Sequence, residues 1–333
     1  MTTPFAQELQ VAIEAVRLAA AFCRTVQPDQ SAALQKADQS PVTVADFGSQ
    51  ALVCRTLARH FPEDAVLSEE RSNVLLTTGG QTAVSEILRR FERLNVSAAS
   101  SKELCQWIDH GQTAVSTATR CWILDPLDGT KGFLRGKQYA IALALAVRGR
   151  VQLSVLACPN LGWEQWDRPP YGTLLYAVAG QGCFAGPLAA STQEAIPVRV
   201  SSRQVPQQAR VCQSFESAHT NQKQTDAVWR RLGLRQQPLR LDSQAKYALV
   251  ARGEAEIYLR ISPSTSRPEK AWDHAAGSLL VTEAGGNVTD INGRPLDFTC
   301  GDQLTNNRGV LATNGLLHSS VLQALQQDGQ ASA

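Results

Sequence analysis

The stretch DPLDGTKGF at residues 125–133 decides how this chain folds and what it can bind. It follows RCWIL at residues 120–124, an apolar run that predicts a buried strand stopped at the proline. That strand would deliver two carboxylates, Asp125 and Asp128, into one tight turn. D-P-x-D by itself is as often an ordinary acidic turn as a binding site, so the residues around it decide between the two.

The backbone of the same turn supplies further binding groups. The carbonyl of Leu127 can face the same way as the two carboxylates, and two carboxylates with one carbonyl form the hard oxygen cage that Mg²⁺ requires. Gly129 lets the chain approach a ligand closely. The amides of Gly129 and Thr130 then stand free at the start of a predicted helix, where a phosphate binds readily. The whole pattern after an apolar strand therefore predicts a joint metal and phosphate site.

Three other carboxylates fit the same site. Glu69 lies in SEE after a short predicted strand, Asp46 ends the segment SPVTVAD, and Asp273 lies in WDHAAG at a predicted helix start. An aspartate at a helix start is most often only a cap, and Asp46 alone would be a surface helix residue. Each signal is weak alone, and their combination carries the interpretation.

In order and approximate spacing, these four segments resemble the inositol-monophosphatase-like superfamily of lithium-sensitive phosphatases, over about residues 34–286. The resemblance implies an α/β (α+β) fold, the layered αβαβα sandwich of the inositol monophosphatase and fructose-1,6-bisphosphatase type. It implies two or three Mg²⁺ ions per site, inhibition by lithium, and attack by water without a phosphoenzyme. The implied metal ligands are Glu69, Asp125, Asp128, Asp273 and the carbonyl of Leu127, and the implied water-activating pair is Asp46 and Thr130.

Within that superfamily, later segments resemble the 3'(2'),5'-bisphosphate nucleotidases. They are KGFLRG at 131–136, ESAHT at 216–220, LDSQAKY at 241–247 and YLR at 258–260. The nucleotidase resemblance suggests that Ser243, Lys246 and Arg260 bind a second phosphate, the 5' one. It also places Ser217 and His219 against the adenine or the ribose. Each has an ordinary alternative, since lysines and arginines are mostly solvated, Ser243 could cap a helix, and His219 could be a loop histidine. Thr220-Asn221-Gln222 departs from the serines and second histidine of many relatives, so base selectivity can differ.

The implied reaction is magnesium-dependent hydrolysis of the 3'-phosphate of adenosine 3',5'-bisphosphate to AMP and phosphate. A second implied substrate is 3'-phosphoadenylyl sulfate, which places the enzyme in sulfur metabolism. One alternative is an inositol polyphosphate 1-phosphatase or a dual-specificity enzyme. A more distant one is an inactive binding protein on the same scaffold, which the intact set of acidic residues disfavours.

Bulk properties are those of a globular protein, and its charge balance allows a local basic pocket for a small anion. The chain has 333 residues, 43% of them hydrophobic, and a net charge of +2, which disfavours a nucleic-acid surface. Its eight cysteines form no C-x-x-C pair and favour a reduced, cytoplasmic protein. The first residues do not resemble a signal peptide, and no apolar run is long enough to cross a membrane. We expect a monomer.

Periodicity and turn residues predict two domains, with the boundary in the proline-containing loop near residue 200. Residues 1–200 would form an α+β domain with most of the metal ligands, and residues 201–333 an α/β domain with the nucleotide-binding residues and Asp273. Predicted helices lie at 5–26, 44–59, 222–232, 243–252 and 273–284. Predicted strands lie at 65–68, 120–124, 138–147, 151–158, 172–179, 182–186, 209–214, 256–261 and 309–313.

Overall fold

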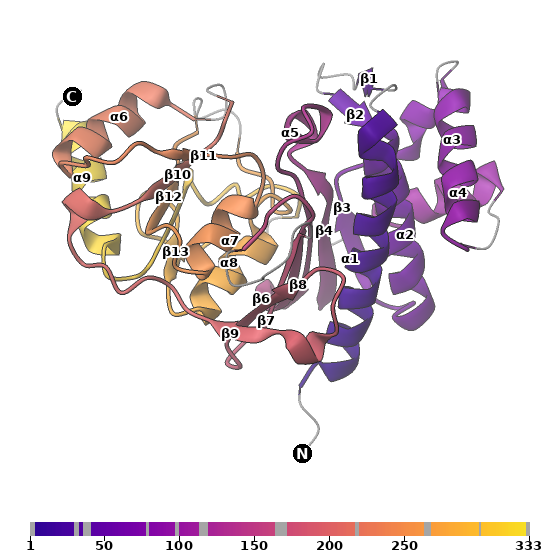
Figure 1. The fold of residues 1–333 in the computed structure, drawn as a ribbon, viewed down its shortest axis with the longest axis horizontal. Helices are drawn as coiled ribbons and strands as arrows, with labels where there is room; N and C mark the ends of the chain where they lie inside the picture. The colour runs from indigo at the N-terminus through magenta and orange to yellow at the C-terminus, as the bar shows by residue number, and fades with distance from the viewer. Residues whose placement is uncertain are drawn as a thin grey trace.

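A computed structural model describes residues 4–29, 33–35, 41–77, 80–96, 100–112, 119–163, 172–216, 220–262, 268–299 and 301–330. Helices and sheets alternate across these residues in layers, with α1 (Ala6–Val26) and α2 (Val44–His60) toward one side and α6 (Gln222–Arg231) and α9 (His318–Gln330) at the other (Figure 1). The layered α/β sandwich predicted from the sequence is confirmed. No helix in the described part of the chain is both long and apolar enough to cross a membrane.

A seven-stranded sheet forms the larger half of the described molecule. β3 and β4 pair in parallel and every later pair is antiparallel, so a chain of short hairpins builds most of the sheet. In sheet order its strands are β3 (Ala65–Ser68), β4 (Arg120–Asp128), β5 (Ala140–Val147), β6 (Arg150–Cys158), β7 (Thr173–Val178), β8 (Cys183–Pro187) and β9 (Ile196–Val198).

A five-stranded mixed sheet forms the second half. β10 lies parallel to both of its neighbours, while β14 lies antiparallel to β12 and β13. In sheet order its strands are β11 (Leu239–Arg240), β10 (Val211–Gln213), β12 (Ile257–Arg260), β14 (Val310–Thr313) and β13 (Asn287–Thr289). A separate two-stranded pair joins β1 (Ala33–Gln35) to β2 (Pro41–Thr43).

Helices fill the spaces between and outside the sheets. One apolar core lies between the long sheet and α1 and α2, a second lies between the two sheets around α7 and α8, and a third lies under α6 and α9. The helices are α1 (Ala6–Val26), α2 (Val44–His60), α3 (Gly80–Arg93), α4 (Ser101–Asp109), α5 (Thr130–Leu134), α6 (Gln222–Arg231), α7 (Ala245–Ala251), α8 (Ala275–Glu283) and α9 (His318–Gln330).

The central strand departs from its predicted end. β4 does not stop after Leu124 but continues to Asp128, with a break in its pairing register against β5 between Asp125 and Asp128. Pro126 has no amide to donate to the ladder, and an irregularity at that position lets pairing resume beyond it. The predicted strand end is therefore wrong, and a bulge lies where the two aspartates are presented.

The start of α7 also differs from the sequence prediction. The helix begins at Ala245, so Ser243 lies ahead of it, with a left-handed backbone φ of 69°. The helix predicted over residues 243–252 therefore starts two residues too early, and Ser243 is not part of the helix that carries Lys246. Strands β1, β2, β9, β11 and β13 and helix α9 were not predicted from the sequence.

The division of the chain into residues 1–200 and 201–333 stays a prediction. The long sheet ends at Val198, and the second sheet begins at Val211. Helix α8 packs against strands of both sheets, so the middle core joins the two halves. Within the described residues the cysteines are free thiols, and all of them except Cys105 are buried.

Candidate active site

A pocket of about 250 Å³ lies where the two halves meet. Of the residues predicted as site residues, it brings together Glu69, Asp125, Leu127, Asp128, Gly129, Thr130, Ser243, Lys246, Arg260 and Asp273. Its remaining lining residues are Lys131, Ser214, Asp242, Gln244 and Tyr258. Residues more than two hundred positions apart in the chain therefore share one cavity.

The four carboxylates predicted as metal ligands face this pocket from three places in the fold. Glu69 follows β3, Asp125 and Asp128 flank the bulge of β4, and Asp273 lies in the turn before α8. Burial raises the pKa of Asp125 well above its usual range, and the charges of Asp128, Glu69 and Asp273 raise it further. Burial and then Asp273 raise the pKa of Asp128 to about 7. The carboxylates therefore repel one another, as clustered acids without a cation do.

This donor set fits magnesium. The lining carboxylates and the carbonyl of Leu127 are hard oxygen donors, and a divalent cation among them would remove the repulsion that raises the pKa values of Asp125 and Asp128. Asp128 is also held in place, because Oδ2 accepts a 2.6 Å hydrogen bond from the amide of Gln244. The hydrogen bond from Gln244 therefore fixes the position of Asp128 in the acidic part of the pocket.

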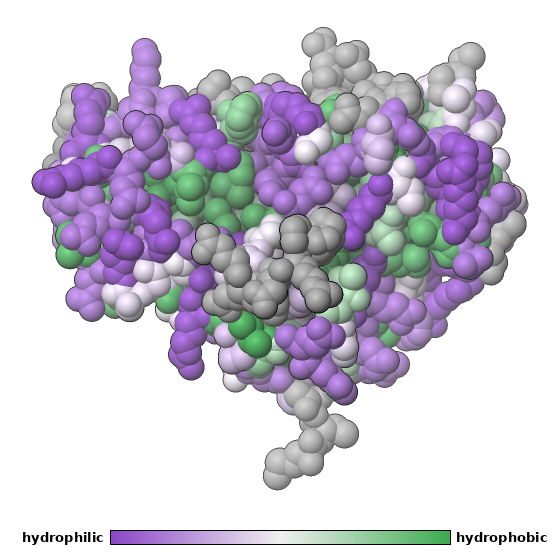
Figure 2. Space-filling model, viewed as in Figure 1, coloured by the Kyte–Doolittle hydropathy of each residue, from purple (hydrophilic) through white to green (hydrophobic). Residues whose placement is uncertain are grey.

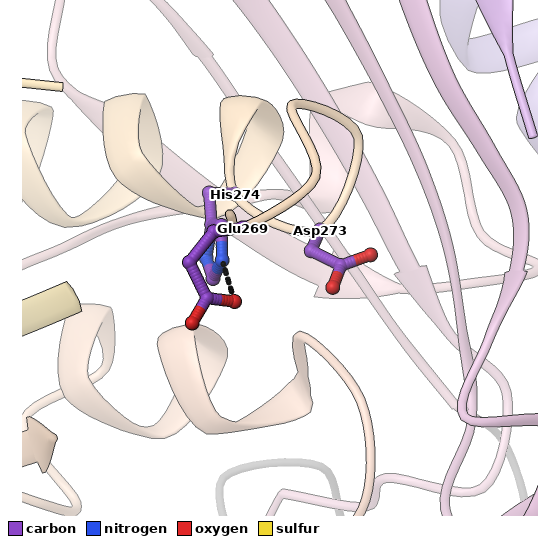
Figure 3. Close-up of side chains that lie close together, drawn as sticks. All are labelled: Glu269, Asp273 and His274. Atoms are coloured by element: carbon purple, nitrogen blue, oxygen red, sulfur yellow. Dashed lines mark hydrogen bonds and ion pairs between the residues drawn. The ribbon is translucent and has the colours of Figure 1, made fainter. Parts of the chain in front are cut away.

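His274 lies next to Asp273 in the chain, but its contacts are with buried residues around the pocket. Glu269, Asp273 and His274 each offer one ligand atom, and these atoms lie within 4.8 Å of one another, with Glu269 and His274 in contact (Figure 3). His274 Nε2 is 3.3 Å from Glu269 Oε2, and its Nδ1 is 2.8 Å from the Tyr247 hydroxyl. His274 is fully buried and does not line the pocket. Because both ring nitrogens have partners, we interpret His274 as a packing residue and not as a metal ligand.

Asp46 lies behind the pocket and reaches it through Thr130. Asp46 is buried in the first turn of α2, where Oδ2 accepts hydrogen bonds from the Thr43 amide and hydroxyl at 2.7 and 2.6 Å. Its other oxygen, Oδ1, lies 3.1 Å from the Thr130 hydroxyl, which lines the pocket. Asp46 thus serves as a helix cap and also as the acceptor for a pocket hydroxyl. The sequence predicted Asp46 as a site residue but did not predict that it lies behind Thr130.

The DPLDGT turn is held by two local features. The Ser49 hydroxyl donates a 2.6 Å hydrogen bond to the Pro126 carbonyl and ties the turn to α2. Gly129 has a φ of 89°, and a Cβ there would lie 3.0 Å from the Cβ of Ser243. Both the backbone conformation and the close approach of the other half of the molecule therefore require glycine at this position.

The predicted second-phosphate residues line the opposite part of the pocket. Lys246 is 4% exposed, and its Nζ lies 3.3 Å from the Leu241 carbonyl and 5.3 Å from the centre of the Tyr258 ring. Burial lowers the pKa of Lys246, Arg260 adds to the shift, and Asp128 opposes it. A buried ammonium facing a pocket is a strong attractor for an anion, because burial weakens its hydration.

Arg260 has carboxylate partners already. Its Nε lies 2.9 Å from Glu269 and its Nη1 3.3 Å from Asp273. Although burial would lower the pKa of Arg260, these two carboxylates hold it above its usual value. The guanidinium therefore stands between the acidic part of the pocket and the Lys246 part. Ser217 and His219, predicted to contact the nucleoside, lie outside the described residues.

Sequence reasoning missed several lining residues. Gln244 has the strongest structural signal, because its side chain accepts from the Gly277 amide and donates to the Trp272 carbonyl, joining the start of α7 to that of α8. Gln244, Asp242, Ser214 and Tyr258 all lie within or beside the segments that carried the nucleotidase resemblance. That neighbourhood is the one signal in the sequence that pointed toward them.

Comparison with known proteins gives a consistent result. The family model described as the inositol monophosphatase family matches residues 2–330. A protein from Oryza sativa named 3'(2'),5'-bisphosphate nucleotidase is 43% identical, over 97% of this chain and 94% of its own. A Schizosaccharomyces pombe protein of the same name is 39% identical, over 96% of this chain and 95% of its own.

Solved structures of low sequence identity share the fold. An IMPase from Thermotoga maritima aligns with a TM-score of 0.68 at 20% identity, over 98% of this chain and 100% of its own. An inositol monophosphatase from Anabaena aligns with a TM-score of 0.63 at 23% identity, over 98% of this chain and 97% of its own. At these identities the likeness describes the backbone arrangement alone.

Proposed function

The chain belongs to the inositol monophosphatase family, and from that premise we propose that it hydrolyses the 3'-phosphate of adenosine 3',5'-bisphosphate, releasing AMP and phosphate. One observation carries the choice of substrate. A single pocket holds a cluster of carboxylates at one part and the buried cation Lys246 at another. That arrangement suits a substrate with two separate phosphates. The relatives named bisphosphate nucleotidases, at 39–43% identity over nearly the whole chain, support it.

Magnesium is the proposed cofactor, in two or three ions held by Glu69, Asp125, Asp128, Asp273 and the Leu127 carbonyl. When bound, such ions neutralise the charge of the scissile phosphate and lower the pKa of water. The remaining groups belong to the chain itself. The amides of Gly129 and Thr130 lie at the start of α5, beside the bulge that presents the aspartates, and would orient the phosphate oxygens.

Thr130 and Asp46 are the proposed proton acceptors for the attacking water. When the Thr130 hydroxyl donates to Asp46 Oδ1 across 3.1 Å, its oxygen lone pairs are left to face the pocket. A water beside it could then transfer a proton to Thr130 as the threonine proton moves to Asp46. The two further hydrogen bonds that Oδ2 accepts from Thr43 hold the carboxylate in the orientation this requires.

The 5'-phosphate is proposed to lie against Lys246, with Ser243 and Arg260 beside it. A compact ammonium on a buried stem suits a phosphate approached from one side. Because Arg260 is shared with Glu269 and Asp273, we assign Lys246 the larger part of the binding energy. The roles of Ser217 and His219 toward the nucleoside stay predictions.

The experiment that tests this function is a phosphate-release comparison on purified protein. The panel holds adenosine 3',5'-bisphosphate, 3'-phosphoadenylyl sulfate, inositol 1,4-bisphosphate and inositol 1-phosphate, each with magnesium and with chelator. We expect the two nucleotides to be preferred and chelator to abolish release. Asp125→Asn and Asp273→Asn serve as inactive controls that stay folded. Preference for the inositol bisphosphate would mean an inositol polyphosphate 1-phosphatase, and no release from any substrate would mean a binding protein.

Three further properties belong to the same proposal. We propose inhibition by lithium, because the small hard Li⁺ ion fits an oxygen site sized for Mg²⁺ but carries half its charge. Lithium, sodium and potassium chloride at equal ionic strength would separate this effect from screening, and equal effects of the three salts would contradict it.

We also propose a cytoplasmic role in sulfur metabolism, and action as a monomer without nucleic acid or membrane. Gel filtration of the active enzyme tests the last point.

A further inference from the structure

One arginine bridges the two halves of the molecule at the rim of the pocket. Arg135 follows α5, which comes directly after the metal-binding turn. Its Nη1 pairs with Glu216 in the segment after β10, and its Nη2 lies 2.8 Å from Oδ2 of Asp242, between β11 and α7. A single side chain from the first half therefore holds two separate segments of the second half.

Other contacts strengthen this bridge. The Arg135 guanidinium lies 4.7 Å from the centre of the Phe215 ring, and Lys131 Nζ lies 3.3 Å from Glu216 Oε2. The hydrogen bond from Arg135 holds the pKa of the Glu216 carboxyl below its usual range. The planar fork of an arginine fixes the directions of two carboxylates at once, which the single ammonium of a lysine does not do.

The bridge ends beside a strained residue of the pocket. Asp242 directly precedes Ser243, whose φ of 69° is a left-handed conformation that non-glycine residues rarely adopt. Such strain persists where the surroundings determine the backbone. Here Asp242 is tied to Arg135 on one side, and the Gln244 amide donates to Asp128 at 2.6 Å on the other. The Ser243 conformation is therefore held from both halves of the pocket.

Asp242 also sets the distance between the two pocket walls. A Cβ on Gly132 would lie 2.6 Å from Asp242 Oδ2, and one on Gly129 would lie 3.4 Å from Asp242 Cβ. The α5 turn and the Ser243 turn are thus packed in direct contact through this residue. Asp242 is 7% exposed and lines the pocket, whereas Arg135 does not line it and acts through its partners.

We propose that Arg135 is a positioning residue that fixes the spacing between two walls of the pocket. The first wall carries Asp125 and Asp128, and the second carries Ser243. Arg135 thereby favours substrates that span both walls over small phosphate monoesters that reach only the first. The proposal rests on the proposed function in one respect, namely that the substrate carries two anionic groups. Hydrophilic side chains are spread widely over the face of the molecule drawn in Figure 2, so an ion pair near the surface is not by itself evidence of a role. Arg135 differs from an ordinary ion pair because it binds two carboxylates, Glu216 and Asp242, and Asp242 adjoins the strained Ser243.

Arg135→Gln is the test variant, and Lys137→Gln is its matched control, removing an equal charge from an exposed residue two positions along. The substrates are adenosine 3',5'-bisphosphate and p-nitrophenyl phosphate. For Arg135→Gln we expect KM for the bisphosphate to rise about tenfold, the size of one lost charge-assisted contact, with a much smaller change in kcat. Its kcat/KM on the small monoester should stay near the wild-type value. Lys137→Gln should match the wild type on both substrates.

Two further variants separate positioning from loss of folding. Arg135→Lys should recover only part of the lost affinity, because it cannot hold both carboxylates. Glu216→Gln keeps the arginine, should raise KM by a smaller factor, and carries the test if Arg135→Gln does not fold. When Arg135→Gln and Glu216→Gln are combined, the rise in KM should be smaller than the product of the two single rises, as expected for groups in one network. Independent effects, equal losses on both substrates, or no loss at all would overturn the positioning role.

The proposed function and this inference can fail separately. If the wild type does not release phosphate from adenosine 3',5'-bisphosphate, the proposed function is wrong. The spacing comparison is then made with the bisphosphate that the wild type hydrolyses fastest, against the same small monoester. A selective rise in KM on that substrate would still support the role of Arg135, and an unselective change would overturn it.

Discussion

Asp46 contributes to the proposed chemistry although it does not line the pocket, because one of its oxygens caps α2 and the other faces Thr130. Removing the Thr130 hydroxyl breaks the hydrogen bond that joins that carboxylate to the pocket. We predict that Thr130→Ala lowers kcat by about 100-fold, the usual size of a lost general-base element, and changes KM much less. Steady-state kinetics on adenosine 3',5'-bisphosphate measure both constants. Thr130→Ser keeps the hydroxyl and should keep most of the activity, and a pure KM effect of the alanine would make Thr130 a binding residue.

Lys246 is the residue on which recognition of the second phosphate depends. We predict that Lys246→Met, which keeps the buried stem and removes the charge, raises KM for adenosine 3',5'-bisphosphate about tenfold or more. The same variant should change KM for adenosine 3'-monophosphate little, because that substrate lacks the 5'-phosphate. Arg240→Gln, at an exposed position of β11, is the control for loss of one positive charge. Equal losses on the two nucleotides would show that Lys246 does not contact the 5' group.

At this scale the sequence predicts residues that lie in continuous motifs. Asp125, Leu127 and Asp128 are supplied by one turn, so their common direction follows from the chain itself. Gln244 and Asp242 could not be assigned in the same way. Their roles arise from contacts with Asp128 and Arg135 in the other half of the molecule, which no local pattern encodes.

At the scale of elements, most helices and strands follow from apolar periodicity, and the errors have specific causes. The prediction ended β4 at its proline, but the strand resumes because Asp128 pairs with Ala140 beyond the bulge. The prediction began α7 two residues early, because tertiary contacts hold Ser243 in a left-handed conformation that propensity does not reveal. Both errors fall in the pocket, where the backbone serves binding instead of regular pairing.

The start of α9 contains a buried histidine that makes stability depend on pH. His318 is 4% exposed, and its Nε2 and Nδ1 each lie 2.9 Å from a threonine hydroxyl, those of Thr289 and Thr313. Burial lowers the pKa of His318 to about 4, below the value near 6.5 of an unfolded histidine. Between these values the unfolded chain binds more protons. The contribution of His318 to stability is therefore full above about pH 6.5 and declines as the pH falls toward 4.

We predict that wild-type protein loses about 1–2 kcal/mol of unfolding free energy between pH 6.5 and 5 through this histidine alone. Urea unfolding at the two pH values measures the loss. His318→Gln should be less stable than wild type at pH 7.5 but should show a smaller loss on acidification. His60→Gln removes an exposed histidine and should leave the pH dependence unchanged. An unaltered pH dependence in His318→Gln would contradict the assignment.

At the scale of the whole molecule, the layers bring the two halves of the pocket together. Helix α8 packs on both sheets, and the turn that precedes it carries Asp273 to the carboxylates of the first half. The layered architecture followed from the resemblance of the motifs to a known family. The way the walls meet did not, because it depends on packing around Gly129, Gly132 and Asp242 that has no sequence period.

Placing several buried carboxylates in one pocket destabilises the metal-free protein, and this gives the final prediction. Asp125 is 1% exposed and is surrounded by Asp128, Glu69 and Asp273, so its charge is unfavourable without a cation. Asp125→Asn removes that charge and keeps the shape. We predict that it raises the unfolding free energy of the metal-free protein by about 1–3 kcal/mol while abolishing activity.

Magnesium should remove most or all of the stability advantage of Asp125→Asn. Because the ion binds the folded chain and not the unfolded one, saturating magnesium should stabilise the wild type by about 2–3 kcal/mol at a hundredfold excess over Kd. Asp125→Asn lacks a ligand and should respond far less. Thermal unfolding with chelator and with magnesium, compared for the two proteins, measures both effects without any substrate. Asp226→Asn, at an exposed position of helix α6, is the control for loss of one negative charge. If Asp125→Asn were less stable than wild type in chelator, the buried carboxylate would be a structural group that is satisfied by the protein alone, and the repulsion inferred for this pocket would be wrong.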